Sequence, residues 1–63
     1  MMKFEDLMQL CTETQPVTVF FSGEQISSTA DALQNFMNET VLDMNVFNIE
    51  AEDDTLRVWL KEV

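Results

Sequence analysis

The sequence predicts a small α+β domain, in which two β-hairpins form a small antiparallel sheet and two short helices pack on one face of it. Three observations favour this class: polar–apolar alternation on both sides of an acidic turn, a second β-branched and aromatic stretch near residue 20, and two short segments with helical spacing of apolar residues. The predicted order is α-β-β-α-β-β, and we expect residues 1–63 to form a single domain.

The clearest signal is the period-two pattern between residues 45 and 63. If Asp53 and Asp54 form a type I′ turn, the aliphatic side chains of both strands share one face, and Glu50 meets Arg57 on the other. The predicted pairs are Glu52–Thr55, Ala51–Leu56, Glu50–Arg57, Ile49–Val58, Asn48–Trp59 and Phe47–Leu60. A slip of one residue would lose both features, so the register is well specified.

The first helix is predicted over residues 3–11. Its apolar face has the spacing i, i+3, i+4 and i+7, formed by Phe4, Leu7, Met8 and Cys11. Acidic residues in its first turn suit the positive end of the helix dipole. A polar break follows, and Pro16 ends it because a residue before proline disfavours the α conformation. We expect Cys11 to be a small core side chain.

The first hairpin is predicted to begin at Pro16. Residues 16–22 are β-branched and aromatic, and Gly23-Glu24 fits a type II′ turn that would pair Phe21 with Ile26. One face of this hairpin would then carry Val17, Val19, Phe21 and Ile26, and the other face would carry Thr18 and Phe20. The second strand is weaker, because it is rich in serine.

The second helix is predicted to start near residue 29. Ser28 or Thr29 can cap it, and its apolar face would consist of Ala30, Leu33, Phe36 and Met37. Asn38 is the expected end of this helix. Residues 41–44 are then expected to lead directly into the C-terminal hairpin.

Charge is the main constraint on function. Three Lys and Arg stand against twelve Asp and Glu, which gives a net charge of −9 spread along the chain. Such a surface repels nucleic acid and anionic lipid and attracts basic partners, so we expect no direct binding to nucleic acid and none to membranes. The simpler interpretation is that the charge only keeps a small protein soluble.

Residue counts exclude most catalytic chemistry. The chain has no histidine, one cysteine and one glycine, so a zinc site, a Cys–His nucleophile and a glycine-rich phosphate loop are all excluded. The acidic residues near the second turn lack the spacing of a calcium-binding loop. We therefore expect no enzymatic activity, no cofactor and no metal.

Location can be predicted from the same counts. A secreted domain of this size would usually contain several disulfides, and residues 1–11 are interrupted by charges, unlike a signal peptide. No apolar run approaches the roughly 20 residues that cross a bilayer. A cytoplasmic location is expected.

One surface stands out as a candidate site. Trp59 and Phe20 are predicted to lie on the sheet face opposite the aliphatic residues, beside Arg57, and exposed Trp and Arg are typical of binding hot spots. The predicted partner-binding residues are Phe20, Glu50, Glu52, Asp53, Asp54, Arg57 and Trp59. The alternative is that a helix covers Trp59, which would make it a core residue.

Three stretches carry a resemblance. The chain opens with Lys3-Phe4-Glu5-Asp6-Leu7-Met8, continues with a Val17–Phe21 strand before Gly23, and ends with a pattern of the type Ile-x-Ala-Glu-Asp-x-x-Leu-x-Val over residues 49–58. In these features it resembles short acidic proteins encoded by bacteriophages and mobile elements of Gram-positive bacteria. Members of this group have no assigned activity, so the resemblance implies a bacterial host and a genomic setting more than a function.

Two functions are consistent with these observations. The first is a non-enzymatic acidic module that binds a basic surface of a host protein; its sharpest form is an inhibitor that mimics nucleic acid, by analogy of size and charge with anti-CRISPR proteins. The second is a structural or accessory phage protein that self-associates, as a homodimer, through the open sheet face. Salt should weaken the first interaction and not the second.

Overall fold

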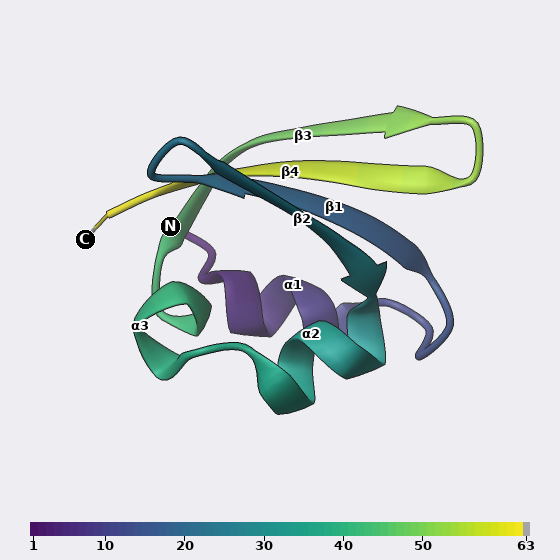
Figure 1. Ribbon diagram of the computed structural model, residues 1–63, viewed down its shortest axis with the longest axis horizontal. Coiled ribbons are helices and arrows are strands. Elements are labelled where there is room, and N and C mark those ends of the chain that lie inside the picture. The colour runs from purple at the N-terminus through teal and green to yellow at the C-terminus, as the bar shows by residue number, and fades with distance from the viewer. Residues whose placement is uncertain (63) are drawn as a thin grey trace.

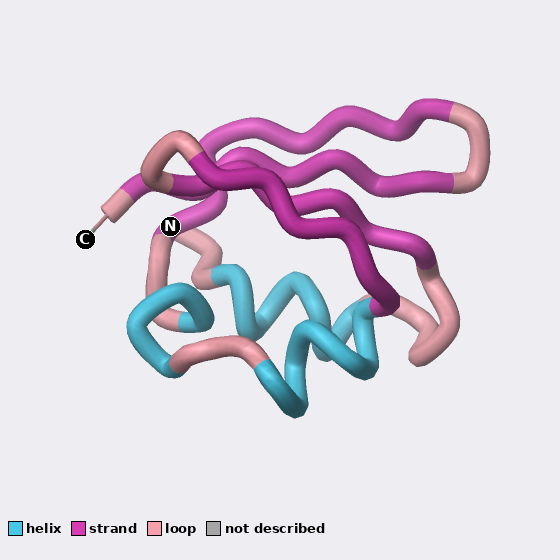
Figure 2. The backbone as a smooth tube through the Cα atoms, in the orientation of Figure 1, coloured by secondary structure: helices cyan, strands magenta, loops and turns pink. Residues whose placement is uncertain are grey.

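Four strands pair in the order β2-β1-β4-β3, and the helices lie on one face of the resulting sheet (Figures 1 and 2). The computed structural model describes residues 1–62. Its elements are α1 (Phe4–Leu10), β1 (Pro16–Phe21), β2 (Glu24–Thr29), α2 (Ala30–Phe36), α3 (Glu39–Leu42), β3 (Asn45–Glu52) and β4 (Thr55–Lys61). The predicted α+β class is therefore confirmed, although the sheet is mixed and a third helix is present.

The two hairpins are joined by a parallel contact between β1 and β4. Val17 pairs with Leu56, Val19 with Val58, and Phe20 with Trp59. The prediction of a wholly antiparallel sheet was wrong at this junction. Alternation within a strand shows which side chains share a face, but it does not show which strand of another hairpin lies alongside.

The core lies between this central strand pair and the helices. Its buried apolar side chains come from every element except β2 and β3, together with Met44: Phe4, Leu7, Met8, Val17, Val19, Ala30, Leu33, Val41, Leu42, Met44, Val58 and Leu60. Strands β1 and β4 supply the valines that are closest to fully buried. The helices therefore cover the middle of the sheet and leave much of β3 exposed.

The β3–β4 hairpin has the predicted register over five of its six pairs, from Glu52–Thr55 to Asn48–Trp59. The sixth was wrong, because Val46 and not Phe47 pairs with Leu60. A β-bulge between Val46 and Asn48 adds one residue to β3 and places Phe47 outside the ladder, 57% exposed. The bulge lets Val46 pack against the core beside Leu60.

The β1–β2 turn consists of Ser22 and Gly23, whose φ angles are +49° and +77°. Two positive φ values are typical of a type I′ turn, so the predicted type II′ turn at Gly23-Glu24 was wrong. Phe21 pairs with Glu24, and Ile26 pairs with Val19 instead of Phe21. The register differs from the prediction by two residues, so the faces stay as predicted.

The helices follow their predicted positions closely at their N-termini. Thr29 caps α2, since its Oγ1 accepts a hydrogen bond of 3.2 Å from the Ala32 N–H. Phe36 was wrongly assigned to the apolar face of α2, because it is 87% exposed and Met37 packs on the core instead. Helix α3 was missed; Asn38 caps it by accepting a hydrogen bond from the Thr40 N–H at 2.8 Å.

None of the helices within residues 1–62 is long and apolar enough to cross a membrane.

Helix α1 offers a matched test of the core. Leu7 is 9% exposed and Leu10, one turn later, is 75% exposed. We expect Leu7→Ala to lower the free energy of unfolding by about 2–4 kcal/mol, because it removes buried methyl groups and leaves a cavity. Leu10→Ala should change it by less than about 0.5 kcal/mol. Urea denaturation measures both, and equal effects would contradict the packing of α1 on the sheet.

The β3–β4 turn allows a second test. Asp53 has a φ of +55°, whereas Asp54 does not have a positive φ, so the predicted type I′ turn was wrong and the first position is the one that favours glycine. Asp53→Gly should raise the free energy of unfolding by about 0.5–1 kcal/mol by relieving the left-handed conformation. Asp54→Gly should give no gain. Thermal melts of the two variants would contradict this turn geometry if Asp54→Gly were the more stable.

Candidate functional site

The face of the sheet opposite the helices carries the candidate site (Figure 1). Side chains alternate between the two faces of each strand, so the register given above fixes which residues share this side. We call this surface the open face; it includes Thr18, Phe20, Gln25, Ser27, Asn48, Glu50, Glu52, Thr55, Arg57, Trp59 and Lys61. Within this face, Thr18 is buried, and its hydroxyl forms a hydrogen bond of 2.9 Å with the hydroxyl of Ser27.

An aromatic pair lies at the centre of the open face. Phe20 and Trp59 are neighbours in the parallel β1–β4 ladder, and their rings stack with centroids 4.7 Å apart and planes inclined by 12°. Both side chains are partly exposed. Two central strands fix the stacked rings, so the two side chains are already ordered before any partner binds.

Arg57 packs against both rings. Its guanidinium carbon lies 5.3 Å from the centroid of Phe20 and 5.2 Å from that of Trp59. Each contact is within the range of cation–π attraction, worth about 0.5–1 kcal/mol where solvent has access.

Two carboxylates hold the guanidinium in place from β3. Arg57 Nη1 donates a hydrogen bond to Glu52 Oε2 at 3.3 Å and lies 3.6 Å from Glu50 Oε1. Exposed ion pairs of this kind add little stability, so their main effect is to orient Arg57. One cation faces two carboxylates, so the side of the aromatic pair toward the hairpin tip is negative, while Lys61 lies on the same face two residues beyond Trp59.

The remaining two predicted site residues lie elsewhere. Asp53 and Asp54 form the tip of the β3–β4 hairpin, and Trp59 is five residues further along β4 from Asp54. At about 3.3 Å per residue, the separation is roughly 16 Å. The structure thus brings together Phe20, Glu50, Glu52, Arg57 and Trp59, and places the two aspartates at the end of the hairpin.

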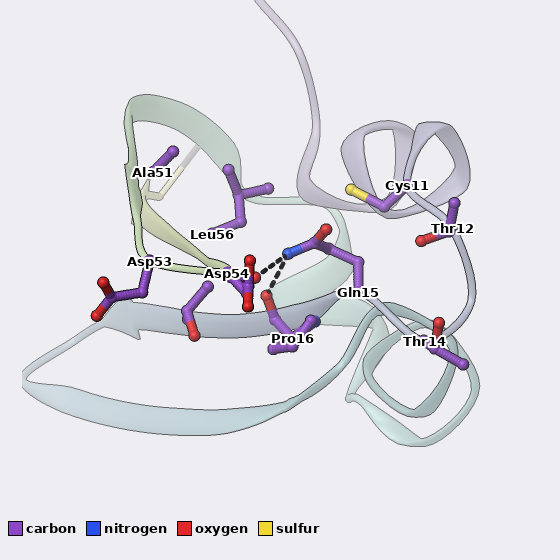
Figure 3. Close-up of a pocket in the computed structure, with 10 residues that line it drawn as sticks. Cys11, Thr12, Thr14, Gln15, Pro16, Ala51, Asp53, Asp54 and Leu56 are labelled. Atoms are coloured by element: carbon purple, nitrogen blue, oxygen red, sulfur yellow. Dashed lines mark hydrogen bonds between the residues drawn. The ribbon is translucent and has the colours of Figure 1, made fainter.

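A shallow hollow of about 470 Å³ lies beside this tip, on the side of the helices (Figure 3). The side-chain amide of Gln15 donates hydrogen bonds to the Pro16 oxygen at 2.9 Å and to the Asp54 oxygen at 2.8 Å. It therefore fastens the hairpin tip to the start of β1. Sequence reasoning missed Gln15, because nothing in the polar segment before Pro16 distinguishes one residue from another.

Cys11 lines the same hollow but is poorly suited to nucleophilic chemistry. Burial raises the pKa of its thiol above the ordinary value of 9.0, so the neutral thiol dominates at pH 7. The chain has no histidine that could serve as a base. Among residues 1–62, no group of three or more His, Cys, Asp or Glu is arranged to hold a metal ion. The hollow therefore offers shape and hydrogen bonds, without an evident catalytic group.

A second hollow of about 540 Å³ lies where the two ends of the chain meet α3. It is lined by Lys3, Thr40, Asp43, Met44 and Glu62. Lys3 Nζ lies 3.6 Å from Asp43 Oδ1, and both side chains are more than half exposed. This ion pair joins the N-terminal segment to the residue after α3, which is a structural role.

Comparisons of the chain with protein-family models, with curated proteins and with solved structures gave no match. The resemblance to short acidic phage proteins therefore stays a prediction.

Fluorescence tests the surroundings of the single tryptophan. Because Glu50 and Glu52 lie beside Arg57 next to the aromatic pair, caesium ions should quench Trp59 more efficiently than iodide ions do. Acrylamide should quench it to an intermediate extent, and Phe20→Ala should increase that extent by removing the stacked ring. Stronger quenching by iodide than by caesium would show that Arg57 outweighs the carboxylates.

Proposed function

We propose that this chain is a non-enzymatic interaction module that binds a basic surface of another protein through its open face. The observation that carries the proposal is the stacked Phe20–Trp59 pair, which is partly exposed, fixed by Arg57 and bordered by acidic side chains. Such a surface combines an aromatic contact with an electrostatic field that attracts cationic partners. Phe20 and Trp59 form the proposed anchor, Glu50 and Glu52 the rim, and Asp53 and Asp54 extend the negative field.

The sharpest form of the proposal is an inhibitor that occupies the nucleic-acid-binding site of a host protein. Sites that bind nucleic acid are rich in Lys and Arg and commonly stack aromatic or arginine side chains on bases. The open face offers carboxylates in place of phosphates and an aromatic pair in place of stacked bases. The setting, a bacteriophage or mobile element in the cytoplasm of a bacterial host, comes from the resemblance alone.

The alternative proposal is self-association of a structural or accessory phage protein through the same face. The apolar surface of the two rings supports it. The net charge of −9 on each copy opposes it, because two acidic faces would meet. Sedimentation at low and high salt separates the two proposals, since screening favours the association of like-charged copies and weakens binding to a basic partner.

The experiment for the leading proposal has two stages. The immobilised protein is first used to capture a partner from a bacterial lysate, with elution by a salt gradient. The purified partner is then tested for competition between this protein and a nucleic-acid duplex. Mutually exclusive binding supports mimicry, whereas a stable ternary complex would refute it.

Kinetics with the purified partner test the division of roles. Trp59→Ala should raise the dissociation rate roughly 30-fold, corresponding to a hot-spot loss of about 2 kcal/mol. The double variant Glu50→Gln/Glu52→Gln should mainly lower the association rate and flatten its dependence on salt. Glu13→Gln/Glu39→Gln is the matched control, since it removes the same charge from exposed positions outside the sheet. Equal effects of the two double variants would mean that only net charge matters.

A further inference from the structure

Strand β3 is an edge strand of the sheet, and part of its outer edge is hydrogen-bonded to the N-terminal segment. The N-terminal segment pairs with its first residues: Lys3 forms an antiparallel bridge with Asn45, the Val46 N–H donates to the Met2 oxygen at 2.8 Å, and the Phe4 N–H donates to the Met44 oxygen at 2.9 Å. The chain itself therefore forms a single β-bridge with this edge. That pairing stops before the bulge at Phe47, and residues 48–52 lie beyond it.

The backbone groups that this free part presents follow from the ladder. The turn at Asp53-Asp54 makes Glu52–Thr55 a pair that exchanges hydrogen bonds. Pairs alternate in type along an antiparallel ladder, so the N–H and C=O groups of Ile49 and Ala51 point away from β4. Within residues 1–62, no hydrogen bond outside the ladders involves these four groups.

The side chains of the free edge differ on its two faces. Ile49 and Ala51 lie on the side of the helices, yet Ile49 is 44% exposed and Ala51 is also exposed. The core packs against the start of β3 at Val46 but does not cover residues 48–52. The hollow lined by Ala51 and Leu56 continues this apolar strip (Figure 3). Glu50 and Glu52 lie on the open face. A strand placed alongside would meet aliphatic groups on one face and carboxylates on the other.

The charge of residues 50–54 indicates which kind of strand could pair with the free edge of β3. Four carboxylates lie between residues 50 and 54, and Arg57 is the only cation bound to them within residues 1–62. Pairing two copies of β3 would bring two such acidic segments together, which like-charge repulsion opposes. A strand with Lys or Arg at alternate positions would instead place its cations beside Glu50 and Glu52.

We propose that the free edge of β3, residues 48–52, binds an extended segment of a basic partner as a fifth strand. This segment has Lys or Arg at alternate positions over Glu50 and Glu52, and aliphatic residues between them over Ile49 and Ala51. The backbone groups of Ile49 and Ala51 supply the hydrogen bonds, and the two side-chain rows supply the selectivity. The inference rests on the proposed function in that the partner is basic, and it adds the form that the bound segment takes.

Two synthetic peptides test this recognition. One is a capped nonapeptide that alternates Val and Lys; the other has the same composition with the valines and lysines in separate blocks. Titration of ¹⁵N-labelled protein should show at least tenfold tighter binding of the alternating peptide. Its largest chemical-shift changes should fall on residues 48–52, and hydrogen exchange of the Ile49 and Ala51 amides should slow.

A backbone variant separates edge pairing from side-chain attraction. Ala51→Pro removes one outward N–H without removing a β3–β4 hydrogen bond, a position at which edge strands tolerate proline. It should weaken binding of the alternating peptide at least tenfold, whereas Ala51→Val, which keeps the N–H, should bind as the wild type does. If Ala51→Pro fails to fold, N-methylation of alternate peptide amides replaces it: only one of the two alternate sets should abolish binding.

Three other results would contradict the pairing of a basic strand with residues 48–52. Equal binding of the alternating and block peptides, or equal effects of the two N-methylated sets, would show charge attraction without strand pairing, and the proposed function would survive. Self-association of the free protein through residues 48–52 would overturn the choice of occupant. If neither peptide bound at low salt, the inference would be overturned, and the result would count against the proposed function as well.

Discussion

The parallel pairing of β1 with β4 is the contact on which the rest of the structure depends. Val19 and Val58 are fully buried neighbours in this ladder, although 39 residues separate them in the chain. An isolated two-stranded hairpin is only marginally stable in water, so neither hairpin would persist alone. Their junction creates a sheet wide enough for the helices to cover, and it also places Phe20 beside Trp59.

Local patterns in the sequence predicted that both hairpins exist and which side chains share a face, but they missed both turn types, the register of β1 with β2 and the parallel junction between the hairpins. Alternation and the Glu50–Arg57 pair together specified the register of β3 with β4, since a slip would have broken both. The bulge at Phe47 could not be predicted, because it depends on the space that the core leaves for Val46. Helix α3 was missed because four residues are too few to show a helical period.

The candidate site was predictable to a similar degree. The alternation of side chains along each strand predicted that Phe20 and Trp59 lie on the same face of the sheet. Their stacking also requires β1 to lie next to β4, and no local pattern in the sequence gives that strand order. The positions of Asp53 and Asp54 followed from the turn, whereas their distance from Trp59 followed only from the fold. The role of Gln15 depends on a contact between residues 39 positions apart, so no local pattern could have indicated it.

The proposed binding would give the acidic hairpin a physical role. Four carboxylates lie within residues 50–54, and their mutual repulsion opposes the folded state. A cationic strand beside Glu50 and Glu52 would relieve that repulsion and satisfy the outward backbone groups of Ile49 and Ala51. The open face and the free edge share these two glutamates, so a basic partner could contact both surfaces at once. Trp59 belongs to the face alone and Ala51 to the edge alone, which makes the two contributions experimentally separable.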